Sequence, residues 1–211
     1  MTYLKTATLA IILGATSASF AHADLIINGG FEDPGVSGTK FLDPSQLPGW
    51  DALGPVELWN RTTGSQPAGP APFEGNQYLE LNSTYGGPYT LFQDFSTVSG
   101  TVYQVTFAHA ARRNLTPAES FQLYLGDDQG NGYSYDIVNG PKAVWATSSF
   151  TFMATGETSR LAFTALNPAD DTYGNFLDAV TVADVPEPGT LGLLALGMLG
   201  IGFARRRQAN A

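Results

Sequence analysis

The chain has 211 residues, no cysteine, and 19 acidic residues against 10 basic ones. The missing cysteines exclude disulfides, thiolate metal sites, Cys nucleophiles and a lipoprotein anchor. The acidic balance disfavours nucleic acid and anionic lipid as partners and suits divalent cations and neutral or cationic ligands.

The first 23 residues predict a secretory signal peptide. Lys5 supplies a positive start, residues 9–15 form a short apolar core, and Ala21-His22-Ala23 has the small-x-small pattern of a cleavage site. We therefore expect export by the Sec machinery, with cleavage after Ala23 and a mature chain that begins at Asp24.

Residues 24–184 have the composition of an all-β domain, rich in Gly, Pro, Thr, Ser and aromatics, with short alternating runs between turn residues. Residues 28–50 predict a loop, and only the two ends of the chain show a helical period. The pattern favours a two-sheet β-sandwich or jelly roll between an N-terminal signal helix and a C-terminal hydrophobic helix. Strands are expected at 25–27, 56–59, 77–81, 91–95, 102–110, 121–125, 133–138, 144–153, 161–165 and 176–182.

Few residues suggest catalysis. His109 is the only histidine after the signal peptide, and it alternates with Phe107 and Val105, which predicts a satisfied, half-buried side chain. No Ser-His-Asp elbow or phosphate loop is present. Residues 127–132 resemble the start of an EF-hand but lack its final Glu, since Val138 stands there, so a hairpin turn is expected. We expect no enzyme, although only geometry could exclude a carboxylate-pair glycosidase.

The last part of the chain has a fixed order of three features. Pro186-Glu187-Pro188 is stiff and extended, residues 190–204 carry no charge, and Arg205, Arg206 and Arg207 follow directly. This order resembles the PEP-CTERM sorting signal of Gram-negative bacteria. The resemblance implies transient anchoring in the inner membrane through about residues 190–204, processing by an exosortase near Pro-Glu-Pro, and delivery to the cell surface or outside. The domains are then residues 1–23, 24–184, 185–207 and a short tail, 208–211.

Four short motifs of the mature part recur in one family of folds. They are Asn28-Gly29-Gly30-Phe31-Glu32, Leu47-Pro48-Gly49-Trp50, residues 74–81 and Phe176-Leu177-Asp178. Their order resembles galactose-binding-like β-sandwiches, namely the carbohydrate-binding modules of xylanases and glucanases and the secreted DUF642 domains. The resemblance implies a jelly-roll fold over nearly all of the mature chain.

The same resemblance implies a structural calcium ion. The ligands carried over are the carbonyls of Gly30 and Gln77 and the carboxylates of Glu32, Glu74 and Asp178. Calcium takes roughly six to eight oxygen ligands, so water would complete the shell. The alternative is that these are solvated turn carboxylates without a metal.

Sugar sites in this family use aromatic platforms and polar side chains on the concave sheet face or in the loops at one end. Tyr85 and Tyr89 are the better exposed candidates, followed by Trp145 and Arg112. Arg112 and its neighbour Arg113 have the alternative role of pairing with local carboxylates, and Trp50 is expected in the core. Other aromatic candidates are Trp59 and Tyr124.

These features predict an exported, non-catalytic surface or matrix protein that binds polysaccharide, such as the exopolysaccharide of a biofilm. Removing the basic residues of the two end segments leaves six basic and nineteen acidic residues, a net charge of about −13. The alternatives are a purely structural or adhesive surface protein, favoured by a self-associating apolar patch, and a glycoside hydrolase, favoured by two carboxylates roughly 5–10 Å apart in a cleft.

Overall fold

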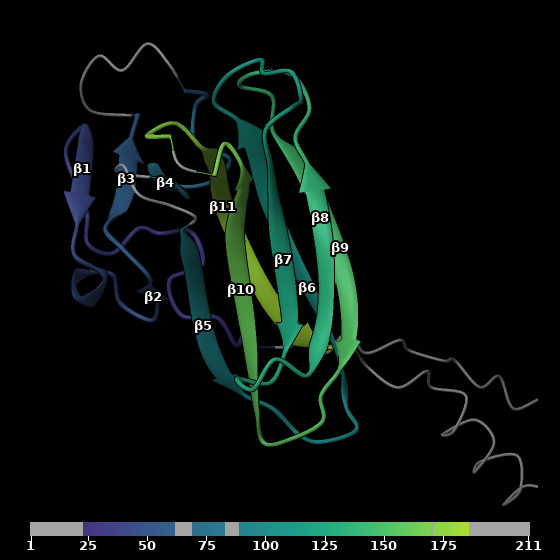
Figure 1. Cartoon of the computed structure of the whole chain (residues 1–211). Coiled ribbons are helices and arrows are strands. Elements are labelled where there is room, and N and C mark those ends of the chain that lie inside the picture. The colour runs from purple at the N-terminus through teal and green to yellow at the C-terminus, as the bar shows by residue number, and fades with distance from the viewer. Residues whose placement is uncertain (1–22, 62–68, 83–88, 170, 186–211) are drawn as a thin grey trace, which may run out of the picture.

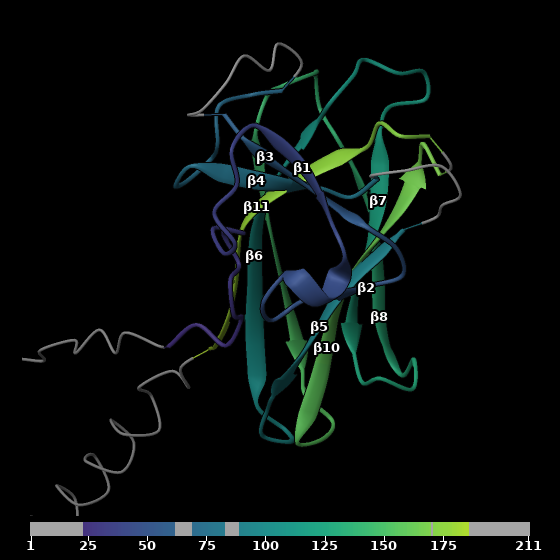
Figure 2. The ribbon, with the colours of Figure 1, turned by 90° about the vertical axis from the view of Figure 1, so that its left-hand side faces the viewer.

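The computed structural model describes residues 23–61, 69–82, 89–169 and 171–185. These residues form two stacked antiparallel sheets, shown face-on in Figure 1 and from the side in Figure 2. The predicted β-sandwich is therefore confirmed. The six-stranded sheet has the order β1 (Thr39–Leu42), β3 (Val56–Asn60), β4 (Gln77–Glu80), β11 (Asn175–Asp184), β6 (Val102–Ala111) and β9 (Ala146–Met153). The five-stranded sheet has the order β2 (Asp51–Ala52), β5 (Thr90–Ser96), β10 (Thr158–Asn167), β7 (Ser120–Gly126) and β8 (Gly132–Val138).

The main core lies between the two sheets and follows from the alternation along the strands. Val105 and Phe107 of β6 face inward and are fully buried. Phe107 meets Phe121 of β7 and Phe163 of β10 edge-on, with ring centroids 6.0 and 5.1 Å apart. Alternate residues of these long strands are buried, so both sheets bury one face here, as the period of two predicts.

Nine of the ten predicted strands are present, but the strand at 25–27 is wrong. Its backbone makes one ladder-like bond, from Leu25 N to the Val182 carbonyl (2.8 Å), and the chain then turns. The side chain of Asp24 takes the place of a second bond, because its Oδ1 accepts from Ile26 N and Val182 N.

The predicted loop 28–50 holds an unpredicted strand, β1, and a short 3-10 helix, η1 (Pro44–Gln46), while β2 begins directly after it. β1 lies at the edge of the six-stranded sheet, and none of its four side chains is buried. An edge strand of this kind lacks the apolar alternation by which strands are recognised in a sequence.

The two ends of the sandwich differ. The turn end, at the bottom of Figure 1, carries the short connections 97–101, 127–131 and 154–157. The hairpin turn predicted at 127–132 is among them, where Asp127 Oδ1 accepts from Gln129 N and Asn131 N. The opposite, loop end carries the longer connections 112–119 and 139–145.

The predicted signal helix, the sorting helix and the span at 190–204 lie outside the described residues. Within the described ranges, no helix is long and apolar enough to cross a membrane.

Candidate functional site

The outer face of the five-stranded sheet carries one row of side chains across all five strands. Asp51 is opposite Phe92, Phe92 is opposite Ala162, Ala162 is opposite Tyr124, and Tyr124 is opposite Ser134. Since residues in register share a face, these five side chains point the same way, away from the core. Figure 1 views this face directly, and no described element of the ribbon crosses in front of it.

Two aromatic residues flank a small one in this row. Phe92 and Tyr124 are half-buried, and the Ala162 methyl between them contributes little height. Two strand spacings separate the rings' backbones by about 10 Å. The Tyr124 hydroxyl donates to the Asp127 carbonyl (2.7 Å), which fixes the ring. The outer side of this sheet thus carries two half-buried rings on either side of Ala162, which is 6% exposed, and aromatic rings are suited to the apolar face of a pyranose ring.

Polar side chains adjoin the row along the strands. Arg160 donates from Nε and Nη2 to the two carboxylate oxygens of Asp94 (2.6 and 2.7 Å), and its guanidinium lies 4.3 Å from the Phe92 ring centroid. On the other side of the row, Gln122 donates to Asp136 (3.1 Å). The face thus offers fixed hydrogen-bonding groups around the aromatic pair.

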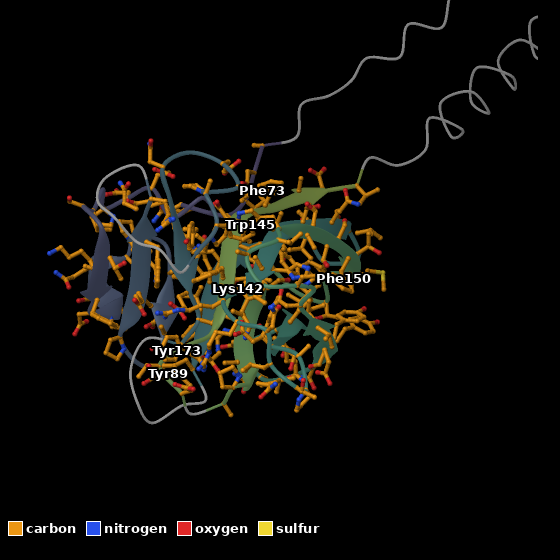
Figure 3. The ribbon with its side chains drawn as sticks, turned by 90° about the horizontal axis from the view of Figure 1, so that it is seen from above. Phe73, Tyr89, Lys142, Trp145, Phe150 and Tyr173 are labelled. Carbon is orange, nitrogen blue, oxygen red and sulfur yellow. The ribbon has the colours of Figure 1, made fainter. Side chains whose placement is uncertain are left out.

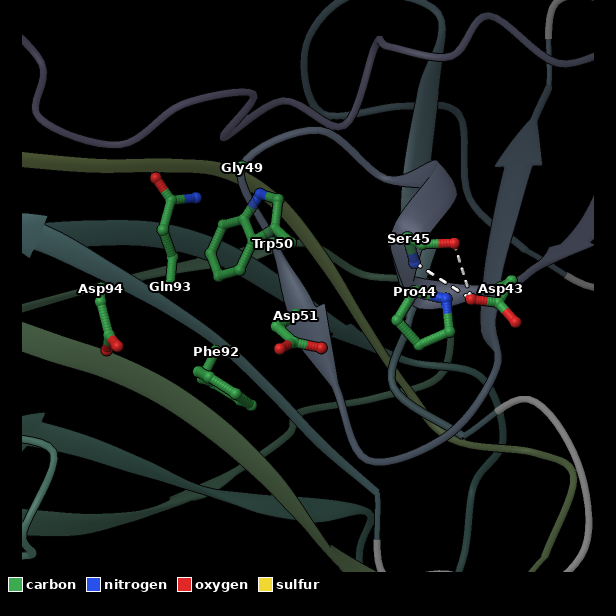
Figure 4. Close-up of a pocket in the computed structure, with 9 residues that line it drawn as sticks. All are labelled: Asp43, Pro44, Ser45, Gly49, Trp50, Asp51, Phe92, Gln93 and Asp94. Carbon is green, nitrogen blue, oxygen red and sulfur yellow. Dashed lines mark hydrogen bonds between the residues drawn. The ribbon is translucent and has the colours of Figure 1, made fainter.

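A depression of about 620 Å³ continues the face at the β2 edge. Figure 4 shows its lining: residues 43–45 of the η1 segment, Gly49 to Asp51, and Phe92 to Asp94 of β5. Its volume is within the range of about 300–1,000 Å³ found for small-molecule sites. Trp50 is buried as predicted, with its indole N–H donating to the Asn28 carbonyl (3.0 Å). It therefore belongs to the core as well as to this lining.

The sequence missed this face as a whole, although it named Tyr124. Phe92 carries a signal that could have found it. In β5, Leu91, Gln93 and Phe95 point into the core, so Phe92 is an apolar residue at a position that alternation assigns to solvent. Such a residue indicates a functional surface more strongly than a buried aromatic does.

Of the residues that the sequence favoured for sugar binding, Tyr89, Arg112 and Trp145 are not on this face. Tyr85 lies outside the described residues. Tyr89 was expected to be exposed, and this is wrong: it is 7% exposed, and its ring packs so closely on Gly54 that a Cβ there would be 2.4 Å from Cε1. Because Gly54 has no side chain, the Tyr89 ring can occupy the space that a Cβ would fill.

Arg112 is part of a buried cluster on the outer side of the six-stranded sheet. Its Nη1 donates to both carboxylate oxygens of Glu80 (2.9 and 2.7 Å). The guanidinium lies between two rings, 4.6 Å from the Trp59 centroid and 4.1 Å from the Tyr173 centroid. The alternative role, pairing with a local carboxylate, is the one that the structure shows for Arg112, and Arg113 likewise pairs with Asp171 (2.6 Å).

Glu57 completes this buried cluster. It faces Glu80 across the β3–β4 pair, and the two are 4% and 0% exposed. Burial raises the pKa of Glu57 to about 7, although the Arg112 charge opposes the shift. Burial, with the Glu57 charge adding to it, also raises the pKa of Glu80 well above its usual range. The pair therefore holds a proton at a pH where exposed carboxyls have lost theirs.

Trp145 lies at the loop end, half-buried, with its indole N–H donating to the Ala71 carbonyl (2.7 Å). It meets Phe73 edge-on at 6.1 Å, and Phe73 is 48% exposed. Figure 3 shows the two rings side by side. The sequence did not predict Phe73, which follows a proline-rich segment and has no strand pattern around it.

His109 has a hydrogen-bond partner for each ring nitrogen, as predicted, but it is buried rather than half-buried. It is 4% exposed, with Nδ1 2.7 Å from Asn139 Oδ1 and Nε2 3.0 Å from Ser148 Oγ. Burial lowers the pKa of its imidazole, so both contacts involve the neutral ring.

The predicted calcium ligands lie around one junction between the N-terminal segment, the loop before β4 and the middle of β11. Glu32 Oε1 accepts from Asn76 N (2.7 Å) and Gln77 N (3.0 Å), which ties the first two together. Asp178 Oδ2 accepts from Phe73 N (2.8 Å) and Glu74 N (3.2 Å), which ties in β11. The Glu74 carboxylate lies against Gly30, since a Cβ there would be 2.8 Å from its Oε1.

This junction fits calcium only in part. Backbone N–H groups already occupy oxygens of Glu32 and Asp178, and among the described residues no three His, Cys, Asp or Glu side chains are grouped to hold a metal. Burial nevertheless raises the pKa of Asp178 to about 7, and the Glu74 charge adds to the rise. Among the described residues no cationic side chain forms an ion pair with Glu74 or Asp178, and a cation beside two such carboxyls would be stabilising.

Comparison with known proteins agrees with this architecture. The sandwich is similar to a carbohydrate-binding module, TmCBM61, solved with β-1,4-galactotriose, at 14% identity and a TM-score of 0.52 over 77% of this chain and 99% of that one. It is equally similar, at 14% identity and a TM-score of 0.52, to part of the MgGH51 α-L-arabinofuranosidase, covering 77% of this chain and 26% of that one. Both likenesses show the fold.

The sequence itself identifies the family. Residues 24–183 match the family described as DUF642, and the chain belongs to it. Residues 184–208 match the PEP-CTERM protein-sorting motif, which indicates export and exosortase-mediated sorting to the surface. No curated protein matches the chain. The two resemblances seen in the sequence are thereby confirmed.

Proposed function

We propose that this chain is a non-catalytic polysaccharide-binding protein of the cell surface or extracellular matrix, and that its binding site is the open face of the five-stranded sheet. The row from Asp51 through Phe92 and Tyr124 to Ser134 carries this proposal, because it places two aromatic rings beside fixed polar groups on an uncovered surface. A glycan of several residues would run across the strands along this row and reach the depression at the β2 edge. The exopolysaccharide of a Gram-negative biofilm is the expected partner.

The position of the carboxyl groups favours binding over hydrolysis. A glycosidase needs a carboxylic acid of raised pKa that reaches the leaving group. The carboxyls whose pKa is raised here, Glu57, Glu80, Glu119 and Asp178, are each less than 5% exposed. Glu57, Glu80 and Asp178 belong to the other sheet, and Glu119 lies just before β7.

Affinity electrophoresis tests the proposal. Residues 24–184 contain both sheets and both apolar clusters, so this segment is the piece to run through gels that carry a polysaccharide panel. One glycan is expected to retard it, and Phe92→Ala and Tyr124→Ala should each weaken that retardation about tenfold, as for a central aromatic contact. The matched control is Phe41→Ala, which removes a 57% exposed ring from the other sheet.

Retardation that survives both substitutions would move the site elsewhere, with Trp145 and Phe73 at the loop end as the next candidates. No retardation by any glycan, including the host exopolysaccharide, would overturn the proposal in favour of a structural or adhesive protein.

We further propose that Ca²⁺ binds at the junction of Gly30, Glu32, Glu74, Gln77 and Asp178 and fastens the N-terminal segment to β11. The support is the convergence of three oxygen-bearing segments there, and the two carboxyls without a cationic partner. Bound calcium would then stabilise the fold by mass action.

The calcium proposal predicts a thermal shift. At a Ca²⁺ concentration about 100 times Kd, the free energy of unfolding should rise by about 3 kcal/mol, and chelator should reverse the change. Glu74→Gln should remove the response without unfolding the domain, because Glu74 is exposed and no hydrogen bond of the described residues uses its side chain. An unchanged melting temperature in both calcium and chelator would contradict the proposal.

A further inference from the structure

The open face has an unbalanced negative charge. Asp43, Asp51, Asp94 and Asp136 lie on it or line its depression, whereas Arg160 is the one cation that the described strands place there. Arg160 is already bound through both Nε and Nη2 to Asp94. The remaining carboxylates therefore have no cation of the protein to balance them within the described face.

Asp43 and Asp51 are the most available of these groups. Asp43 Oδ1 caps η1 by accepting from Ser45 N (3.2 Å) and Ser45 Oγ (2.9 Å), and Asp51 Oδ1 accepts from Ala52 N (2.8 Å). Both residues are exposed, and the second oxygen of each makes no hydrogen bond to the described residues. In the view of Figure 4, Asp51 lies between Asp43 and Asp94 around the depression.

The aromatic row places these carboxylates where they would meet a bound glycan. Asp51 is the direct cross-strand neighbour of Phe92. Asp94 is two residues further along β5 on the same face, so Asp51 and Asp94 are diagonal cross-strand neighbours, whose backbones are about 7–8 Å apart. A sugar stacked beside Phe92 would bring its ring substituents into the depression, next to Asp51 and Asp43.

We infer that the glycan is a polysaccharide that contains amino sugars with free ammonium groups. This inference rests on the proposed function, because it names the class of glycan for the same face. An ammonium group on the sugar next to the stacked ring would pair with Asp51 or Asp43 and donate to the free oxygen. A uronate or sulfated sugar would place a second negative charge there and be repelled. An N-acetylated or plain hydroxylated sugar would keep the stacking and gain no ion pair.

The test compares three oligosaccharides that share a β-1,4-linked backbone and differ in charge, together with one anionic oligosaccharide of another backbone. Residues 24–184 are titrated with β-1,4-linked glucosamine hexamer, its N-acetylated form, the matching neutral glucose hexamer, and an oligogalacturonate. Exposed ion pairs change affinity by about two- to five-fold each, so a hexamer whose amines pair with both Asp51 and Asp43 should bind about four- to twenty-five-fold more tightly than its N-acetylated form. This preference should shrink as salt is raised from 0.01 to about 0.5 M.

The variants distinguish an ion pair at the depression from non-specific attraction of a cationic sugar to an acidic protein. Asp51→Asn keeps size and hydrogen bonding and should lower the affinity for the amine about two- to five-fold, with little change for the N-acetylated form. Glu157→Gln removes an equal charge from an exposed residue of the turn end and should leave both unchanged. Phe92→Ala should weaken binding of both sugars.

Equal affinity for the amine and its N-acetylated form would overturn the inference while leaving the proposed function in place, and so would tighter binding of the uronate. The inference would also be overturned if Asp51→Asn and Glu157→Gln lowered the affinity for the amine equally and Phe92→Ala did not change it. That result would indicate non-specific attraction between the cationic sugar and the acidic protein. Binding of none of the four sugars would count against both this inference and the proposed function.

Discussion

Each sheet carries on its outer face an arginine that pairs with a carboxylate and stacks on an aromatic ring. This set is buried on the six-stranded sheet and exposed on the five-stranded sheet. On the six-stranded sheet, Arg112 pairs with Glu80 and stacks on Trp59. On the five-stranded sheet, Arg160 pairs with Asp94 and stacks on Phe92. The side chains of the first pair are 13% and 0% exposed, and those of the second are 27% and 39% exposed.

Coverage by loops makes the difference. Around Arg112, Tyr173 lies against the guanidinium, and Gly174 N donates to Glu80 Oε1 (2.6 Å), so the connection before β11 closes over the pair. Near Arg160 the adjacent connection is the short turn after β7, which leaves the face open. An Arg-carboxylate-aromatic set thus fixes the fold where a long loop covers it and remains available to a ligand where the connection is short.

Removing the buried arginine should have the largest effect. Arg112→Ala leaves Glu80 buried without its cation, which typically costs about 3–5 kcal/mol. Urea unfolding of residues 24–184 at pH 8 measures the loss. At pH 5 the loss should be smaller, because the raised pKa of Glu80 allows it to take up a proton. A change below about 1 kcal/mol at pH 8 would show that the pair is not buried as described.

The Glu57–Glu80 pair should make stability depend on pH. Because the folded pKa of Glu57 is raised from 4.5 to about 7, the folded state holds its proton more tightly than the unfolded chain. Its contribution is therefore fully present below about pH 4.5, is lost as the pH rises through about 7, and stays absent above that.

Glu57→Gln tests this dependence, since its amide oxygen can still accept a hydrogen bond from Glu80. It should flatten the loss of stability between about pH 4.5 and 7 and raise the free energy of unfolding at pH 8 by about 1–3 kcal/mol. Asp136→Asn, on the open face, is the control and should leave the profile unchanged. An identical pH profile in the Glu57 variant would mean that the carboxyl pair does not govern it.

The contrast between the two outer faces shows which feature could not be predicted from the sequence, namely whether a face is covered by loops. Period-two alternation helped to locate nine strands, and it put Val105 and Phe107 on one face of β6, which is the face buried in the core. The same alternation cannot say whether the outward side is covered. By this alternation Tyr78 and Glu80 point to the side of β4 opposite Leu79, which packs in the core between the sheets. Both are nevertheless buried, because the segments that contain Gly69 and Gly174 pack over them. Coverage depends on long-range contacts, so the sequence predicted an exposed ring at Tyr89, which is buried, and did not predict the partly exposed ring of Phe92.

The smallest effect on stability is expected at the exposed arginine, together with a loss of glycan affinity. Arg160→Ala breaks a pair in contact with solvent, so the free energy of unfolding should fall by less than about 1 kcal/mol. The same change frees Asp94 and removes the guanidinium from the Phe92 ring, so it alters the charge and the shape of the proposed site at once. Affinity for a neutral glycan should fall several-fold, because a hydrogen-bonding group beside the ring is lost. Urea unfolding and affinity electrophoresis on the same preparation check both expectations. A loss of stability as large as that of Arg112→Ala would show that the five-stranded sheet also depends on its outer pair, and the distinction between a fold-fixing face and a ligand-binding face would fail.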